Sequence, residues 1–136
     1  MVDVENIVFT QVATSLRSEF SGIFVSGETV AAPSTFPAAT IVEMDNSIYE
    51  RSIDSSKTEN HVTVMYQAEA YSNRTSGRKS EAKKILADID KTMESLGFVR
   101  ISKSPMNNMD SSIYRMVARY RAVIGEHEDN YLVFHK

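Results

Sequence analysis

The chain has 136 residues, a length typical of a single domain with one hydrophobic core, and its formal net charge of −3 argues against a nucleic-acid binder with a strongly basic face. It contains no cysteine, which excludes disulfides, thiol catalysis and cysteine-ligated metals. No signal-peptide pattern opens the sequence, and no apolar run approaches the roughly 18 residues of a membrane span, so we expect a soluble cytosolic protein without membrane contact.

The first third of the chain predicts one helix followed by short strands. Apolar residues recur every three or four positions from Val4 to Phe20, and Asp3 precedes them as a helix cap. Residues 23–32 hold two short apolar runs separated by a polar turn, which is typical of a small hairpin. Residues 38–44 alternate between two sets of side chains and predict a strand.

Residues 45–59 form the most polar segment of the chain and show no sustained period. We expect a long mobile loop, because loops of this length in compact domains are usually functional or disordered. The segment carries four acids and two basic residues: Asp45, Glu50, Asp54 and Glu59, against Arg51 and Lys57.

The rest of the chain is organised around residues 60–97, which read as a strand, a turn and a helix. Residues 61–71 alternate between apolar and polar side chains, as a half-buried strand does. In residues 78–96 the apolar side chains are spaced three and four residues apart and therefore share one side of a helix. They are Ala82, Ile85, Leu86, Ile89, Met93 and Leu96.

The end of this helix and its packing are also predicted. Gly97 follows the last apolar residue, where a left-handed helix terminus favours a residue without a Cβ atom. The unit is stable only if the apolar helix stripe lies on the apolar strand face. We therefore expect Leu86 and Ile89 to be buried against the face that carries Tyr66 and Ala68.

The last third predicts strands joined by turns. Residues 98–103, 113–124 and 131–135 have strand patterns, and residues 104–112 and 125–130 are rich in turn-forming or acidic side chains. Because most connections are short, we predict one α+β domain over all 136 residues. Its antiparallel or mixed β-sheet should have the two helices packed on one face.

No pattern for catalysis or cofactor binding is present. The three histidines are far apart in the sequence, and there is no phosphate-binding glycine loop, nucleophile elbow or zinc-protease helix motif. The carboxylates of Asp88 and Asp90 are expected on a solvated helix side. We therefore predict a protein that is not an enzyme and that uses no metal or other cofactor.

Two basic features break ordinary expectations. Basic residues crowd the start of the second helix, where the helix dipole favours negative charge; these are Arg74, Arg78, Lys79, Lys83 and Lys84. They serve solubility or hold an acidic group. The second feature is a stripe on one face of the 113–124 strand, formed by Arg115, Arg119 and Arg121. This stripe contacts nucleic acid, pairs with acids of a neighbouring chain, or faces water.

Several short motifs between about residues 23 and 124 carry a resemblance to a known family: Thr35-Phe36-Pro37, Glu43-Met44-Asp45-Asn46, Glu59-Asn60-His61, Tyr71-Ser72-Asn73 with Thr75-Ser76-Gly77-Arg78-Lys79-Ser80-Glu81, and Tyr114-Arg115-Met116-Val117-Ala118-Arg119-Tyr120. In these motifs the chain resembles small proteins from the structural modules of tailed bacteriophages and prophages of low-GC Gram-positive bacteria. Within that group it is similar to tail-terminator, or tail-completion, subunits.

The resemblance implies an α+β subunit of a hexameric ring that caps the tail tube and joins it to the head connector. The implied partners are further copies of the chain, the tail tube protein and head-connector or neck proteins, with DNA only as cargo passing through the ring. The implied location is the host cytoplasm during assembly and then the head–tail junction of the virion. The alternatives are another neck or head-completion protein, or a small nucleic-acid-binding module that uses the arginine stripe.

A head-to-tail ring needs complementary surfaces on opposite sides of each subunit. The acidic segment 43–59 and the basic segment 74–84 have opposite charge and are separated by a long strand, so we expect them to meet across subunits. The candidate interface residues are Asp45, Glu50, Asp54, Arg74, Arg78, Lys79, Lys83, Arg115, Arg119 and Arg121.

Overall fold

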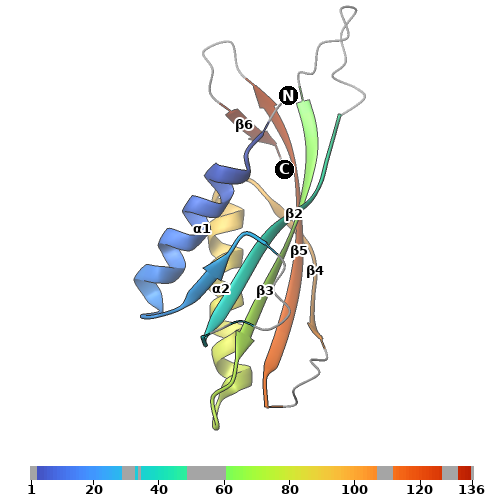
Figure 1. Ribbon diagram of the computed structural model, residues 1–136. Helices are drawn as coiled ribbons and strands as arrows, with labels where there is room; N and C mark the ends of the chain where they lie inside the picture. The colour runs from blue at the N-terminus through green and yellow to red at the C-terminus, as the bar shows by residue number, and fades with distance from the viewer. Residues whose placement is uncertain are drawn as a thin grey trace, which may run out of the picture.

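A computed structural model describes residues 3–28, 33, 35–48, 61–106, 112–126 and 132–135. It has two layers, a six-stranded mixed sheet and two helices packed on one face of that sheet (Figure 1), which confirms the predicted α+β class. The elements are α1 (Glu5–Glu19), β1 (Phe24–Ser26), β2 (Ala38–Ile48), β3 (His61–Ser72), α2 (Arg78–Ser95), β4 (Val99–Met106), β5 (Tyr114–Glu126) and β6 (Leu132–His135). No helix in these ranges is long and apolar enough to cross a membrane.

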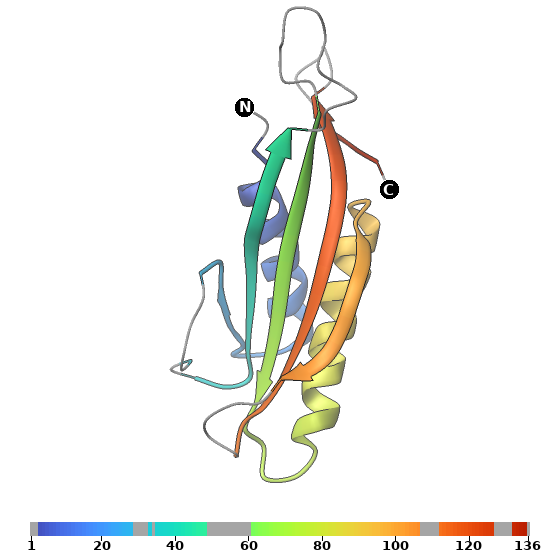
Figure 2. The ribbon, with the colours of Figure 1, turned by 90° about the vertical axis from the view of Figure 1, so that its right-hand side faces the viewer.

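The strand order is β1-β2-β3-β5-β4, and β6 pairs with β5 beyond Val99, the first residue of β4. All neighbours are antiparallel except β1 and β2, which are parallel. Figure 2 shows the second face of the sheet, which no helix covers, with both helices behind it. This is the uncovered face of the sheet.

The core lies between α2 and the two longest strands, β3 and β5. Five residues of α2 are buried, and the predicted stripe is confirmed, with Leu86 and Ile89 at most 1% exposed. Because side chains alternate between the two faces of a strand, β3 presents Tyr66 and Ala68 to α2, and both are as deeply buried as Leu86 and Ile89. The ring of Phe98 meets that of Tyr66 edge-on, with 5.5 Å between centroids.

The end of α2 follows the predicted glycine cap. Gly97 has φ of 97°, and its N–H donates to the carbonyl of Glu94 at 3.0 Å, while the N–H of Phe98 donates to the carbonyl of Met93 at 2.9 Å. This pair of bonds is the Schellman arrangement, which satisfies the last helix carbonyls and turns the chain into β4. At the start of α1, the Asp3 carboxylate accepts the Glu5 N–H at 3.1 Å, one residue before the capping position Val4.

Two predicted boundaries are wrong, and the predicted hairpin stays untested. The first arm of the predicted 23–32 hairpin is β1, which pairs in parallel with β2, and the second arm, residues 30–32, lies outside the described residues. The predicted 45–59 loop begins too early, because β2 continues to Ile48 paired with β3, and residues 49–60 are outside the described part. The predicted 104–112 turn overlaps β4, which runs on to Met106.

The buried α2 stripe gives a direct stability test. Leu86→Ala and Ile89→Ala should each lower the free energy of unfolding by roughly 2–5 kcal/mol, because each leaves a cavity between α2 and the sheet. The matched control is Lys84→Ala on the exposed side of the same helix, with an expected change below about 0.5 kcal/mol. Denaturant melts that show less than about half a kcal/mol for both core variants would contradict this packing.

Candidate assembly surfaces

The predicted arginine stripe lies on the uncovered face. Arg115, Arg119 and Arg121 alternate with buried residues that face the helices, and stand opposite Tyr71, Gln67 and Met65 of β3. Their environments differ. Arg119 and Arg121 are exposed, whereas the Arg115 side chain is only 21% exposed. The stripe is therefore not a uniform charged surface.

Arg115 belongs to a buried polar network around Glu69, which is 2% exposed. Its Nε donates to Glu69 Oε1 at 2.7 Å, and its Nη2 contacts the same oxygen. The hydroxyls of Thr40 and Tyr71 each lie 3.4 Å from Glu69 Oε2 as donors, and the Arg115 guanidinium lies 5.3 Å from the Tyr71 ring centroid. Arg115 thus links neighbouring strands within one subunit, and its role at a subunit interface stays a prediction.

Arg119 makes a weaker contact, since its Nε donates to Gln67 Oε1 at 3.0 Å on an exposed surface. The two arginines provide a matched pair for a stability test. Arg115→Ala should cost about 3 kcal/mol, because it leaves the buried Glu69 carboxylate without its ion-pair partner. Arg119→Ala should cost less than about 0.5 kcal/mol.

Equilibrium urea unfolding of the two variants measures both changes. Equal costs for Arg115→Ala and Arg119→Ala would show that the Glu69 ion pair contributes nothing beyond a surface contact.

The two edges of the sheet display apolar side chains to solvent. Four of the five large apolar side chains that are exposed in the described residues lie on β2 or β4: Met44, Val99, Ile101 and Met106. All eight residues of β4 are exposed. On the opposite edge, β1 pairs with only Ala38–Thr40 of β2, so β2 beyond Thr40 has no strand partner on that side among the described residues. Unpaired edges of this kind bind other strands.

The charges on these edges have opposite sign. The charged residues of β4 are Arg100 and Lys103, both basic. Those of β2 are Glu43 and Asp45, both acidic. Asp45, predicted from sequence as an interface residue, is exposed on this acidic edge.

The basic start of α2 lies at the other end of the strands from Asp45. Asp45 stands opposite Met65, early in β3, whereas α2 begins after the turn that follows Ser72. Lys79, Lys83 and Lys84 line an open hollow of about 590 Å³ on the outer side of α2. Arg74 Nη1 lies 3.6 Å from Glu81 Oε2, and Glu81 Oε1 accepts a hydrogen bond from the Ser72 hydroxyl at 2.7 Å.

These positions leave part of the expected charge pairing untested. Glu50 and Asp54 lie outside the described residues. We expected Asp45 to lie far from the cluster of Arg78, Lys79 and Lys83 within one subunit, and it does. The pairing of these charges across subunits stays a prediction.

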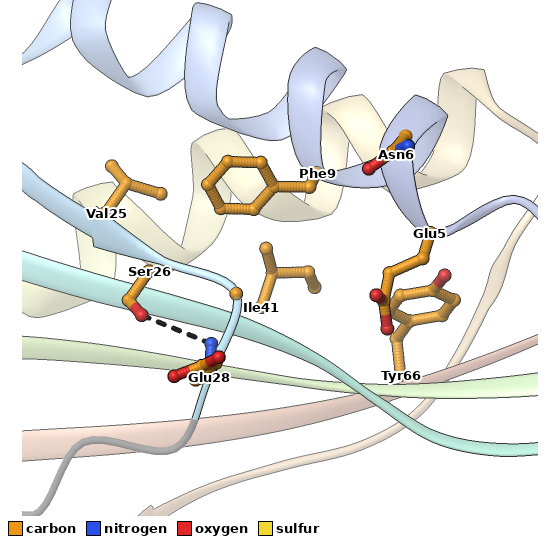
Figure 3. A pocket seen from close by; sticks show the side chains of 9 residues that line it. Glu5, Asn6, Phe9, Val25, Ser26, Glu28, Ile41 and Tyr66 are labelled. Atoms are coloured by element: carbon orange, nitrogen blue, oxygen red, sulfur yellow. Dashed lines mark hydrogen bonds between the residues drawn. The ribbon is translucent and has the colours of Figure 1, made fainter.

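A hollow of about 400 Å³ lies between the start of α1, β1 and β2. Figure 3 shows Phe9 of α1 and Ile41 of β2 pointing into it, with Glu5 beside the ring of Tyr66. Outside it, the Tyr66 hydroxyl donates to Glu43 Oε1 at 3.1 Å. The hollow therefore has a mixed lining, with apolar side chains such as Phe9 and Ile41 beside the acidic Glu5 and Glu28, and it lies next to the acidic edge of β2.

Glu43 is the acid whose titration this environment changes. Burial raises the pKa of Glu43, the hydrogen bond from Tyr66 opposes that rise, and the negative charges of Glu5 and Asp3 add to it. Burial likewise raises the pKa of Tyr66, as does the nearby Glu43 carboxylate, so the hydroxyl remains a donor.

The raised pKa of Glu43 fixes a pH dependence. The folded state holds the Glu43 proton more tightly than the unfolded chain does. The contribution of this group to folding stability is therefore most favourable at a pH below its ordinary pKa of 4.5, and it is lost as the pH rises through the raised pKa. Glu43→Gln stays neutral, so its stability relative to wild type should increase from about pH 4 to about pH 8. In the Tyr66→Phe background, which lacks the opposing hydrogen bond, the increase should be larger. Thermal melts across this range measure it, and a pH-independent difference would contradict the assignment.

Asp88 and Asp90 were predicted on a solvated helix side, but both are engaged in contacts within the fold, which corrects that prediction. The Ser15 hydroxyl contacts both carboxylate oxygens of Asp88, at 3.0 and 2.9 Å, and links α1 to α2. Asp90 accepts the Tyr120 hydroxyl at 3.0 Å and Arg100 Nη1 at 3.3 Å, and so links α2 to β5 and β4. Neither contact can be read from sequence, because both depend on how the helices lie.

No group of three or more acidic or histidine side chains in the described ranges is arranged to hold a metal ion. What the geometry presents is a set of surfaces: two chemically distinct sheet edges, the uncovered face and the basic start of α2. No protein-family model and no curated protein matches this chain.

Proposed function

We propose that this protein is a structural subunit of a tailed bacteriophage or prophage virion, a tail terminator that forms a ring. The ring caps the tail tube and joins it to the head connector. The observation that best supports this proposal is the pair of exposed sheet edges, one basic and one acidic, each with apolar side chains in water. Such edges suit a subunit that is completed by copies of itself.

Head-to-tail association follows from the difference between the two edges. A contact between unlike surfaces leaves one of each surface free on the resulting dimer, so growth continues until the ring closes. The basic residues Lys79 and Lys83 lie at the start of α2, toward one end of the strands. They are then available to components stacked along the ring axis, the tail tube on one side or the connector on the other.

The nucleic-acid-binding alternative is disfavoured by the engagement of the arginine stripe. Arg115 is paired with Glu69 and Arg119 contacts Gln67, so two of the three guanidinium groups already have partners on the sheet. The overall charge of −3 also opposes phosphate binding. DNA therefore enters the proposal only as cargo passing through the ring.

Solution mass and electron microscopy test the proposed function. Light scattering over a concentration series should give a closed oligomer, six-fold in the proposed ring, and negative-stain images should show rings with a central opening. Added to growing tail tubes, the protein should stop their elongation.

A protein that stays monomeric at every concentration, and that binds duplex DNA in a salt-dependent manner, would instead support the nucleic-acid-binding module.

A further inference from the structure

The two edge strands run in opposite directions and have stretches at the same height in the sheet. Three successive antiparallel pairings, β2 with β3, β3 with β5 and β5 with β4, make β2 and β4 antiparallel to each other. Following the register across the sheet, Val99 shares a row with Asp45, and Ser102 shares a row with Val42. Both stretches therefore stand at one level on opposite edges.

The irregularities of the two edges coincide at this level. Met44 is an extra residue of β2 between the partners of Tyr66 and Met65, and Ile101 is an extra residue of β4 between the partners of Tyr120 and Arg119. Between the row of Val99 and Asp45 and the row of Ser102 and Val42, β2 and β4 each have two residues, whereas β3 and β5 each have one. The edges consequently match each other in residue count, and a ladder between them needs no bulge of its own.

We propose that Val99–Ser102 of one copy pairs antiparallel with Val42–Asp45 of the next copy, so that the sheets of neighbouring subunits join edge to edge. The pairing presupposes the ring proposed above and names its contact surface. In a closed ring whose axis runs along the strands, neighbouring copies are related without any rise, so edges at one height meet. The pairs are then Asp45 with Val99, Met44 with Arg100, Glu43 with Ile101, and Val42 with Ser102.

Charge and apolar contact both favour this arrangement. Arg100 and Glu43 both lie on the helix side of the sheet, opposite Tyr120 and Tyr66, so the pairing brings Arg100, which also contacts Asp90, next to Glu43 of the neighbouring copy. Cross-strand pairs of opposite charge are stabilising. Met44 and Ile101 are 52% and 49% exposed in the isolated subunit, and both would leave water. The ladder ends at Val42, because β1 and the following Gly27 flank β2 below that point.

Cysteine cross-linking tests the pairing, because the natural chain has no thiol that could interfere. The double variant Asp45→Cys/Val99→Cys places one thiol on each edge. Opposed residues on antiparallel strands lie about 4.5–5.5 Å apart at Cα, which a disulfide can span. Mild oxidation should give a ladder of covalent oligomers that ends at the ring size. Each single variant should remain monomeric on a non-reducing gel.

The matched control is Asp45→Cys/Met106→Cys, which keeps the same acidic-edge thiol and moves the other to the far end of β4. Met106 lies seven positions after Val99, or about 23 Å along the strand, so the control should give no ladder. If the first double variant does not fold by circular dichroism, Val42→Cys/Ser102→Cys tests the other end of the same stretch.

The outcomes separate this pairing from the ring itself. A covalent ladder for the same-height pair and none for the control supports the pairing. Rings by microscopy without a ladder overturn the pairing and leave the terminator proposal standing. A ladder of equal yield in the control also overturns it, since collision alone then explains the cross-links. Monomers without cross-links contradict both proposals.

Discussion

The packing of α2 on β3 and β5 is the interaction on which the rest of the structure depends. Its apolar stripe, centred on Ile85 and Ile89, matches the helix-facing side of the two longest strands, and α1 then packs beside α2. Two helices cannot cover a six-stranded sheet on both faces. One face therefore lacks a helix layer, and β4 lies at the margin of the layer that exists, with all its residues exposed.

The uncovered face is stabilised by its own side chains. Glu69 lies near the middle of that face and is almost completely buried, yet the arrangement is stable because Arg115, Thr40 and Tyr71 supply its donors from three adjacent strands. A buried ion pair costs solvation as well as gaining attraction, so its value lies in specifying which strands lie together and in which register. A one-residue slip of β5 against β3 would move Arg115 to the helix side and leave the carboxylate without a charge partner.

What could be predicted from the sequence depends on how local each signal is. The α2 stripe and Gly97 are determined within one element, and both were predicted correctly. The end of β2 was not, because its polar residues from Asp45 onward are held in a strand by pairing with β3 and have no strand pattern of their own. For the candidate surfaces, the arginine face followed from alternation alone. The pairing of Arg115 with Glu69 did not, since residues 46 positions apart meet only through the register of two strands.

The edges of the sheet carry devices that usually prevent strand pairing, and their distribution argues for selective rather than absent association. Charged side chains, a proline and a bulge all blunt edges, and β4 has Lys103, Pro105 and the irregularity at Ile101. Like charges oppose pairing of β4 with another β4, and of the acidic edge of β2 with another copy of itself, so a symmetric edge-to-edge dimer is disfavoured on both sides. Pro105 lacks an N–H, but it lies outside Val99–Ser102 and so does not interrupt the proposed pairing. The extra residue of β4 has a matching extra residue only on β2. The features that make each edge a poor partner for itself leave the opposite edge of another copy as the complementary surface.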